Sequence, residues 1–534
     1  MKPPNSCVSV AFVVLISFAL QSSSSSHEDF LQCLYLHSPN ATSFSKLVFT
    51  TTNSSYSSLL HFSIHNLRFS SDTTPKPLVI VTPLRPSHIQ ASIFCSQRHG
   101  LQIRTRSGGH DYEGLSYVSH HLPFIVLDLI NLNSVQVDRH SATAWVQSGA
   151  TVGQVYYQIA QKTKSLAFPA GVCTTMGVGG HFSGGGYGFL MRKYGLAADN
   201  IIDAHIIDAK GRLLDRESMG EDLFWAIRGG GGASFGVITA WKIRLVSVPP
   251  SVTVFRIPRT LEQNATKLVH IWQSVGSKLD KDLFIRVILQ RVNVNNRTTI
   301  QASFESMFLG SVGKLLPLMQ DMFPELGLVR EDCVEMSWID SILYFANFSS
   351  GSPLEVLLNR TDLTNGLFFK AKSDYVRKAI PEDGLEGIWT MFYEQEAEFA
   401  IMILNPYGGR MDEIPEDEIP FPHRFGNLYK IQHEVYWLEE GNEAEERHIN
   451  WIRRLYAYMA PFVSKSPRAA YLNYRDLDIG VNNNNGHTGY DEASIWGSKY
   501  FKNNFKRLAD VKTNVDPLNF FRNEQSIPSL IPSH

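Results

Sequence analysis

The sequence predicts an α+β fold, because strand and helix patterns mix without the regular strand–helix–strand rhythm of a parallel sheet. Leu78–Val81 and Phe124–Leu127 are short apolar runs typical of buried strands. Between them, Ile89, Ile93 and Phe94 repeat at helical spacing. The first third of the chain therefore contains both kinds of element.

The same mixture continues to the end of this first unit. Val152 to Ile159 has helical spacing, and residues 200–214 have the pattern of two strands that turn at Lys210-Gly211. Val237 to Val248 alternates as a strand does, and Pro249-Pro250 ends the unit.

The second unit repeats this composition. Leu283 to Val292 is a predicted strand, and residues 261–279 and 310–322 are predicted helices. Residues 411–422 are acidic and rich in proline, which predicts a surface loop. Apolar residues between 496 and 508 have helical spacing and predict a helix near the C-terminus.

The N-terminus predicts secretion. Lys2 precedes the apolar run Val8–Leu20 and the serine stretch Ser22–Ser26, the pattern of a signal peptide over residues 1–26. The apolar run is shorter than the roughly 20 residues that span a bilayer. The net charge of −2 and the absence of a basic run argue against nucleic acid or an acidic membrane as partner. We expect a secreted monomer that acts on a small molecule.

The cysteines and the glycosylation sequons are also consistent with a secreted protein. Four cysteines follow the signal segment, and an oxidising compartment favours their pairing, although their spacing leaves the partners open. The histidines, including His120-His121, lack the spacing of metal ligands, so no metal site is predicted. Six N-x-S/T sequons predict glycosylation at Asn40, Asn53, Asn264, Asn296, Asn347 and Asn359.

Three segments are rich in glycine: residues 104–114, 171–188 and 228–236. Glycine lets the backbone approach a ligand closely, and successive N–H groups can hold an anion. Neither a P-loop nor a GxGxxG motif after a strand is present. Glycine content alone favours tight turns over ligand binding.

The motifs in these segments carry a family resemblance. RSGGHDYEG, GGHFSGGGYG and the later NYRDLDIG resemble the plant berberine bridge enzyme-like family, and the likeness runs from Phe30 to Pro528. It implies a vanillyl-alcohol-oxidase or PCMH-type FAD-binding domain over 73–248, after an N-terminal segment over 27–72. It also implies a substrate domain with an antiparallel sheet over 249–470, and a C-terminal berberine-bridge-type segment over 471–534.

The resemblance implies FAD held by two covalent bonds, 8α-histidyl at His110 and 6-S-cysteinyl at Cys173. It also implies a Cys33–Cys95 disulfide, which leaves Cys333 as a buried thiol. Where the family commonly has Cys-Pro-Thr, this chain has Thr174-Thr175-Met176 after the cysteine, with Met176 at a position that controls oxygen access. Further expected cofactor-binding residues are Arg104, Ser107, Gly108, Gly109, Gly177, Gly180, His181 and Asn519.

Tyr474 is the expected catalytic base. Lys430 and Gln432 lie two apart in a strand pattern and so face one side. Relatives that oxidise monolignols carry the same pair, and the ammonium of Lys430 is expected to lower the pKa of Tyr474. Berberine bridge enzyme uses a glutamate base where Gln432 stands, and an amide cannot serve as that base, which argues against its bridge-forming reaction.

Four further residues complete the expected site. Tyr112 and Tyr187 match aromatic positions near the flavin, with core packing as the alternative. Arg286 and Ile288 share one strand face that would meet substrate, although an arginine at the surface is an equal alternative.

The expected function is an FAD-linked oxidoreductase of plant specialised metabolism. It would transfer hydride from a phenolic, allylic alcohol or alkaloid to the flavin, with reoxidation by O₂ or another acceptor. The alternatives are a carbohydrate oxidase, a Diels–Alderase-like cyclase without net redox chemistry, and a flavin-binding protein with little turnover. Secretion would deliver it to the apoplast, cell wall or vacuole.

Overall fold

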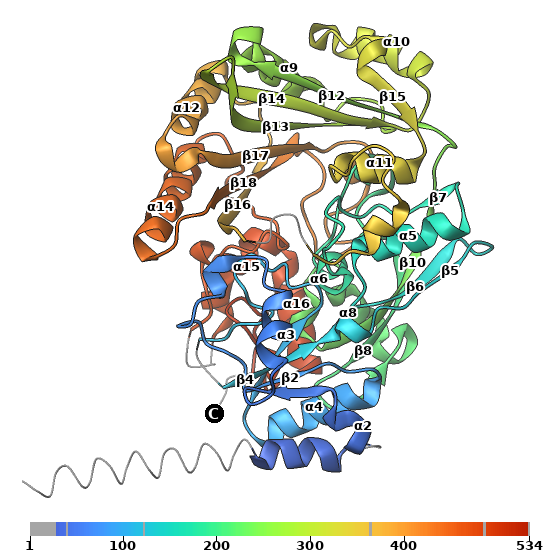
Figure 1. Ribbon diagram of the computed structural model, residues 1–534, viewed down its shortest axis with the longest axis vertical. Coiled ribbons are helices and arrows are strands. Elements are labelled where there is room, and N and C mark those ends of the chain that lie inside the picture. The colour runs from blue at the N-terminus through green and yellow to red at the C-terminus, as the bar shows by residue number, and fades with distance from the viewer. Residues whose placement is uncertain (1–27, 39–40, 121–122, 362–365, 484–487, 532–534) are drawn as a thin grey trace, which may run out of the picture.

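The computed structural model describes residues 28–38, 41–120, 123–361, 366–483 and 488–531. The predicted signal segment and Asn40 lie outside these residues. The described chain combines helices with mixed and antiparallel sheets, which confirms the α+β prediction. Figure 1 shows the seven-stranded sheet in the upper half of the molecule and the smaller sheets below it.

The first sheet has the order β1-β2-β4-β3, and β4 pairs in parallel with both β2 and β3. Its strands carry only buried or half-buried residues, as expected for a sheet covered on both faces. The glycine-rich segment after β3 therefore starts at the edge of a rigid element. The bounds are β1 Val48–Thr50, β2 Val79–Val81, α4 Pro86–Arg98, β3 Gln102–Arg106 and β4 Phe124–Asp128.

The second sheet is antiparallel, in the order β5-β6-β10-β8-β9. Helix α5 begins at a capping box formed by Thr151 and Gln154, which satisfies two of the N–H groups that a helix start leaves free. The bounds are β5 Val135–Asp138, β6 Thr143–Gln147, α5 Val152–Lys162, β7 Leu166–Ala167, α6 Val178–Ser183, α7 Met191–Tyr194, β8 Ile201–Ile207, β9 Leu213–Leu214, α8 Arg216–Ile227, β10 Val237–Arg244 and β11 Val246–Ser247.

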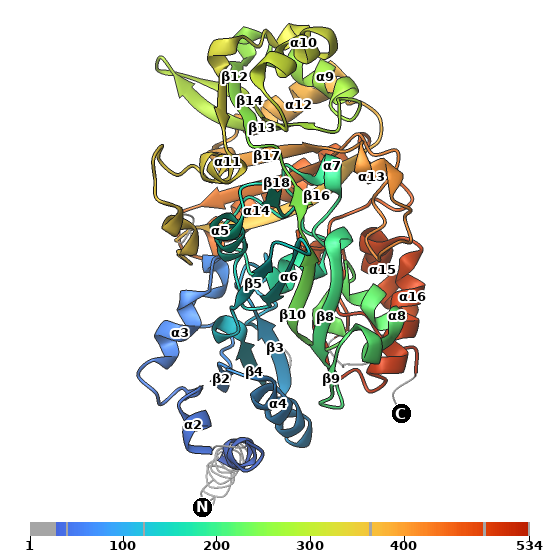
Figure 2. The same ribbon diagram turned by 90° about the vertical axis from the view of Figure 1, so that its right-hand side faces the viewer.

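The seven-stranded antiparallel sheet has the order β15-β12-β14-β13-β17-β18-β16. Alternate residues of β13 pack against helices α9, α10, α12 and α14, whereas Phe284 packs with the core of the lower half. One face of this sheet therefore carries helices and the other faces the smaller sheets, as Figure 2 also shows. The bounds are β12 Val252–Thr260, α9 Ala265–Val275, β13 Leu283–Val294, β14 Arg297–Phe308, α10 Val312–Met322, β15 Cys333–Met336, α11 Trp338–Phe345, β16 Phe368–Val376, α12 Glu382–Phe392, β17 Phe399–Pro406, β18 Tyr429–Trp437 and α14 Asn442–Met459.

The C-terminal residues return to the lower half, where they pack with the core around α8 (Figure 1). The single helix predicted here is wrong, because α15 (Tyr490–Phe501) and α16 (Asn504–Val515) are separated at Lys502, which has a φ of 47°. The surface loop predicted over 411–422 is also partly wrong. Only residues 413 and 415–418 are exposed, whereas Ile419 and Phe421 belong to the main core. A short helix, α13, covers Arg410–Glu413.

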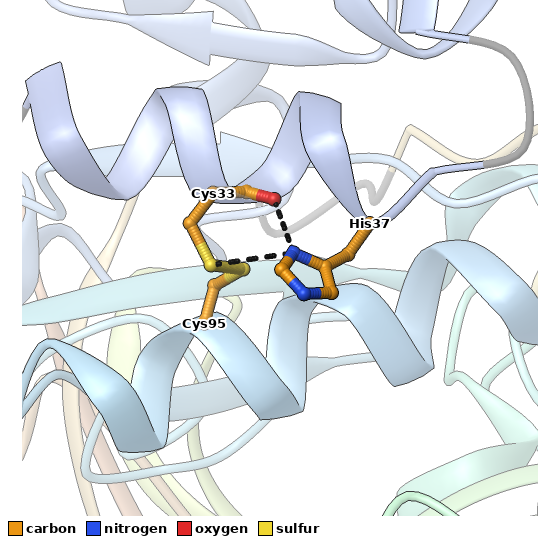
Figure 3. Close-up of side chains that lie close together, drawn as sticks. All are labelled: Cys33, His37 and Cys95. Carbon is orange, nitrogen blue, oxygen red and sulfur yellow. Dashed lines mark hydrogen bonds between the residues drawn. A yellow bond between two sulfur atoms is a disulfide. The ribbon is translucent and has the colours of Figure 1, made fainter.

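Cys33 and Cys95 form the expected disulfide, which joins the helical residues 28–36 to α4 (Figure 3). The ring of His37 lies beside it, and its Nδ1 is 3.0 Å from the carbonyl of Cys33. These three residues are close enough to hold a metal, but the disulfide occupies both sulfurs. Cys333 is half-buried rather than buried, and burial raises the pKa of its thiol to about 11.

Two short helices flank β1 in the sequence: α2 (Ala41–Ser45) and α3 (Tyr56–Phe62). Among the helices of the described ranges, none combines the length and apolar character needed to cross a membrane.

Candidate active site

The first two glycine-rich segments cross each other backbone to backbone. A Cβ on Gly108 would clash with the backbone of Gly177, and a Cβ on Gly177 would clash with Gly108. Gly109 has a φ of 75°, and a side chain there would strike the carbonyl of Ser63. Glycine is therefore required here by close approach, and the crossing fixes the residues that follow each segment.

The crossing brings His110 and Cys173 to the same place. The Thr175 hydroxyl lies 3.0 Å from His110 Nε2 and 3.3 Å from Cys173 Sγ, so one side chain touches both residues. The His110 ring stacks on His65, with ring centroids 3.8 Å apart. Burial, then the neighbouring His65, lowers the pKa of His110 well below its usual value, so the imidazole is neutral.

The start of α5 holds the cysteine segment in position. Val152 N–H donates to the Met176 carbonyl and Gly153 N–H donates to the Thr174 carbonyl, at 2.9 and 2.8 Å. Gly153 has no room for a side chain, because a Cβ there would strike the Leu357 carbonyl and press on Thr174. Residues 173–177, which lack the proline common in the family, are thus fixed by backbone hydrogen bonds.

His181 and Met176 close one side of this arrangement. The N–H of Gly171 donates to His181 Nε2 at 2.9 Å, which makes that nitrogen an acceptor. Burial, then the charge of Lys430, lowers the pKa of His181 to about 4, consistent with a neutral ring. The Met176 methyl group would lie only 2.6 Å from a Cβ on Gly171, so it fills the space there.

A cavity of about 680 Å³ lies between these segments and the seven-stranded sheet. All three glycine-rich segments line it, and we call residues 104–114, 171–188 and 228–236 the glycine cradle. Opposite lie side chains from three adjacent strands, β13, β17 and β18. We call this set the sheet wall: Arg286, Ile403, Asn405, Gln432, Glu434 and Tyr436.

Strand register explains the sheet wall. In β18, Lys430, Gln432, Glu434 and Tyr436 alternate onto one face. Across the sheet, Asn405 pairs with Lys430 and Ile403 pairs with Gln432. Arg286 is held by Glu305, with Nη2 and Oε2 2.6 Å apart, and its guanidinium lies 4.9 Å from the centroid of the Phe189 ring.

Lys430 lies behind the cavity surface, within a cluster of tyrosine rings. Its Nζ is 3.4 Å from the ring centroid of Tyr187, 3.7 Å from that of Tyr471 and 4.8 Å from that of Tyr474. The hydroxyls of Tyr187 and Tyr474 are hydrogen-bonded to each other, and Asn405 Nδ2 donates to the Tyr187 hydroxyl at 3.1 Å.

The structure corrects the protonation states expected for Tyr474 and Lys430. Burial raises the pKa of Tyr474 well above its usual value, and neighbouring tyrosines raise it further. Burial alone lowers the pKa of Lys430 well below its usual value. The prediction that Lys430 lowers the pKa of Tyr474 is therefore wrong, because the amine meets ring faces and is itself desolvated. The resting pair is a neutral phenol beside an amine that burial drives toward its neutral form.

Tyr112 connects the glycine cradle to the sheet wall. Its ring stacks on that of Tyr474, with centroids 5.6 Å apart and planes 9° from parallel. Its hydroxyl accepts a hydrogen bond from Gln432 Nε2 at 2.8 Å, and Gln432 Nε2 also donates to Glu434 at 2.7 Å. Gln432 therefore acts as a donor, and the carboxyl group of this face is Glu434.

Most of the predicted site residues line the cavity, and three do not. Lys430 lies behind tyrosine rings, Ile288 shares the face of Arg286 without reaching the cavity, and Asn519 forms a turn with a φ of 51°. Asn523 lines the cavity instead of Asn519. The predicted residues that do line it are Arg104, Ser107, Gly108, Gly109, His110, Tyr112, Cys173, Gly177, Gly180, His181, Tyr187, Arg286, Gln432 and Tyr474.

Sequence reasoning missed several residues of the site, among them Glu434, Thr175, Asn405 and Tyr471. Glu434 was detectable, because the alternation that pairs Lys430 with Gln432 continues to it. Thr175, Asn405 and Tyr471 gave no comparable signal, since their roles depend on contacts with distant segments. The five sequon asparagines that the structure describes are all exposed: Asn53, Asn264, Asn296, Asn347 and Asn359.

Comparison with known proteins places this cavity in a family. A model for an FAD binding domain matches residues 77–216, and one described as berberine and berberine-like matches residues 470–528. Tetrahydroberberine oxidase from Berberis wilsoniae is 56% identical over 517 residues, 96% of each chain. The chain belongs to the berberine bridge enzyme-like family. Berberine bridge enzyme-like 28 from Arabidopsis thaliana is 51% identical over 520 residues, 97% of each chain.

Solved structures of the family agree with the fold. The structure of berberine bridge enzyme-like 28 matches with a TM-score of 0.89, over 94% of this chain and 100% of that one. Phl p 4, a grass pollen allergen with glucose dehydrogenase activity, is 46% identical and matches with a TM-score of 0.87 over the same shares. The protein is therefore an FAD-dependent oxidoreductase with a PCMH-type FAD-binding fold.

The residues present fit this cofactor. Arg104 is buried in the cavity lining, and its Nε and Nη1 have no protein acceptor, although Nη2 is paired with Glu524 at 2.9 Å. Such orphaned charged donors suit an anionic ligand. A Cβ on Gly180 would have nothing within 4 Å, so the cavity is open above the helix backbone there. FAD, when bound, supplies the hydride acceptor of the reaction.

Proposed function

We propose that the protein holds FAD through covalent bonds from both His110 and Cys173. The observation that carries this proposal is the Thr175 hydroxyl, which touches both side chains and so indicates that they reach one ligand. The low pKa of His110 leaves a neutral, nucleophilic imidazole. Cys173 takes no part in a disulfide.

Tyr474 is the proposed proton acceptor for a substrate hydroxyl. Its own phenol is protonated at rest, so a second group must receive the proton that it passes on. The buried amine of Lys430 suits that role, because desolvation favours its neutral form while three ring faces can stabilise the cation. Tyr187 and Asn405 fix the orientation of the Tyr474 hydroxyl.

The proposed substrate is a phenolic, an allylic alcohol or an alkaloid. Apolar side chains from four elements line the cavity, which favours a flat aromatic compound over a sugar. The name of the relative tetrahydroberberine oxidase supports keeping alkaloids in this class. The lining apolar residues used in this argument are Phe284, Phe345, Phe348, Phe369 and Ile403.

Secretion and the proposed final electron acceptor follow from separate observations. A disulfide and five exposed sequons support an extracellular or vacuolar location. Relatives include an oxidase and a glucose dehydrogenase, so either O₂ or another acceptor is consistent with the family. The domain boundary proposed at residue 249 lies between β11 and β12.

Anaerobic flavin bleaching tests the proposal. The enzyme is mixed without oxygen with coniferyl alcohol, an aromatic alkaloid or glucose, each in a separate experiment. The absorbance of the oxidised flavin, at about 450 nm, is followed. We expect the aromatic compounds to bleach it. Bleaching by glucose alone would make the protein a carbohydrate oxidase. Cyclisation of two substrates with no bleaching by any compound would remove the redox proposal.

A further inference from the structure

Two carboxyl groups line the cavity, and they differ in their partners. Asp111 lies 3.5 Å from Arg475 and accepts the backbone N–H groups of Glu113 and Leu115. Glu434 forms no ion pair with any described residue. The sheet wall therefore carries a carboxyl group whose charge the protein leaves unmatched.

The partners of Glu434 are neutral donors. Gln432 Nε2 lies 2.7 Å from its Oε1, the Tyr112 hydroxyl lies 3.5 Å from the same atom, and Tyr436 is a third hydrogen-bond partner. These contacts orient the carboxyl group without neutralising it. Burial raises the pKa of Glu434 to about 7, so its neutral form is favoured at lower pH and a nearby cation would favour the carboxylate.

Aromatic rings surround this carboxyl group. The Tyr112 ring meets the edge of Phe369, with centroids 5.3 Å apart and planes 88° apart. The Phe369 ring lies 5.5 Å from that of Tyr436, and all three residues line the cavity. A carboxyl group with aromatic side chains beside it can bind organic ammonium ions, because ring quadrupoles and a negative charge both attract the cation.

We propose that Glu434 binds the cationic amine of the substrate, with the rings of Tyr112, Phe369 and Tyr436 packed around it. This inference rests on the proposed function, since it treats the cavity as the substrate site. It narrows the substrate to aromatic compounds that carry a basic or quaternary amine. The amine end then lies at Glu434, and the hydroxyl end lies toward Tyr474.

The pH dependence of this binding follows from the groups around Glu434. Tyr112 and Tyr187 remain phenols, because burial raises the pKa of both, and Tyr436 is the third titratable neighbour. The flanking strands place Ala371 and Ile401 opposite Glu434, and neither titrates. Affinity for a quaternary amine should therefore rise as the pH passes through about 7, where Glu434 loses its proton.

The test compares N,N-dimethyltetrahydroisoquinolinium with its uncharged carbon isostere, 2,2-dimethyltetralin. Binding to the oxidised, flavin-loaded enzyme is measured at pH 8 by calorimetry and by perturbation of the flavin spectrum. We expect the cation to bind at least about tenfold more tightly, the size of one charge-assisted contact. Glu434→Gln should abolish this preference, keep its flavin and keep the affinity for the uncharged compound. Glu440→Gln, which removes an exposed carboxylate beyond the end of the same strand, should leave the preference intact.

Two results would overturn the inference: a wild-type enzyme that binds both probes equally, or a Glu434→Gln variant that retains the preference. The measurement is independent of turnover, because it follows equilibrium binding to the oxidised enzyme. The proposed oxidation can therefore fail in the bleaching experiment while amine binding stands, and the reverse outcome is equally distinguishable.

Discussion

The glycine cradle and the sheet wall face one cavity, yet they are built from different parts of the chain. The cradle uses backbone, because Gly108 and Gly177 meet without side chains and leave His110 and Cys173 beside Thr175. The sheet wall uses side chains that alternate from three strands, with Glu434 and Gln432 as its polar members. The cradle thus fixes its residues through backbone contacts, whereas side chains of the wall can change without altering the fold.

The largest effect should come from removing the hydroxyl group of Tyr474, on which the glycine cradle and the sheet wall converge. Tyr474→Phe should slow anaerobic flavin reduction by roughly 10²- to 10⁴-fold, the contribution of a positioned acid or base. Stopped-flow absorbance with the best aromatic substrate measures this. Tyr458→Phe is the matched control, because its hydroxyl bonds to Gly384 away from the cavity. Equal reduction rates in wild type and Tyr474→Phe would exclude this residue as the base.

Two glycine substitutions distinguish a glycine needed for backbone packing in the cradle from a glycine that leaves room for the flavin. Gly108→Ala should cost about 3 kcal/mol or more, because its Cβ meets the fixed backbone of Gly177. Gly180→Ala should change the free energy of unfolding by less than about 1 kcal/mol, since nothing lies within 4 Å of its Cβ, yet lower the flavin content. Urea unfolding and the ratio of flavin to protein absorbance measure the two effects. Similar flavin loss without destabilisation in both variants would contradict the crossing described for the cradle.

Glu434 should give the sheet wall a stability that depends on pH. Its pKa is raised by burial from 4.5 to about 7, so its contribution is full below pH 4.5 and is lost as the pH rises through 7. The wild-type free energy of unfolding, taken relative to Glu434→Gln, should fall by roughly 3 kcal/mol over this range. Urea titrations at several pH values measure it, and a constant difference between the two proteins would show that Glu434 titrates normally.

A smaller effect on stability is expected for Arg286 of the sheet wall, because its partner Glu305 also has a second cation beside it. Arg286→Met removes one cation from the buried Glu305, but Arg256 remains bonded to the same carboxylate. We expect a loss of about 1 kcal/mol, below the 3 to 5 kcal/mol typical when a buried charge loses its only partner. Urea unfolding of the Arg286→Met and Arg256→Met single variants and of the double variant measures this, and additive losses would contradict the shared role.

The contrast between a cradle built from backbone and a wall built from side chains also explains which parts of the site the sequence could predict. His110 and Cys173 lie in glycine motifs that are continuous in sequence, so the cofactor class could be predicted from those motifs. The apolar spacing predicts a single tail helix, because the positive φ of Lys502 that separates α15 from α16 leaves no apolar signature. The burial of Lys430 depends on Tyr187 and Tyr471, which come from distant segments, so its desolvated state could not be read from β18 alone.

The covalent state of the flavin is the most direct test of the account. The flavin-loaded enzyme is digested, and peptides that absorb at flavin wavelengths are sequenced by mass spectrometry. We expect the peptide with His110 and the peptide with Cys173 to be joined through a single flavin, and His110→Ala or Cys173→Ala to leave the flavin on the remaining partner. Recovery of Cys173 as an alkylated thiol, together with an unmodified His110 peptide, would contradict the proposed bicovalent attachment.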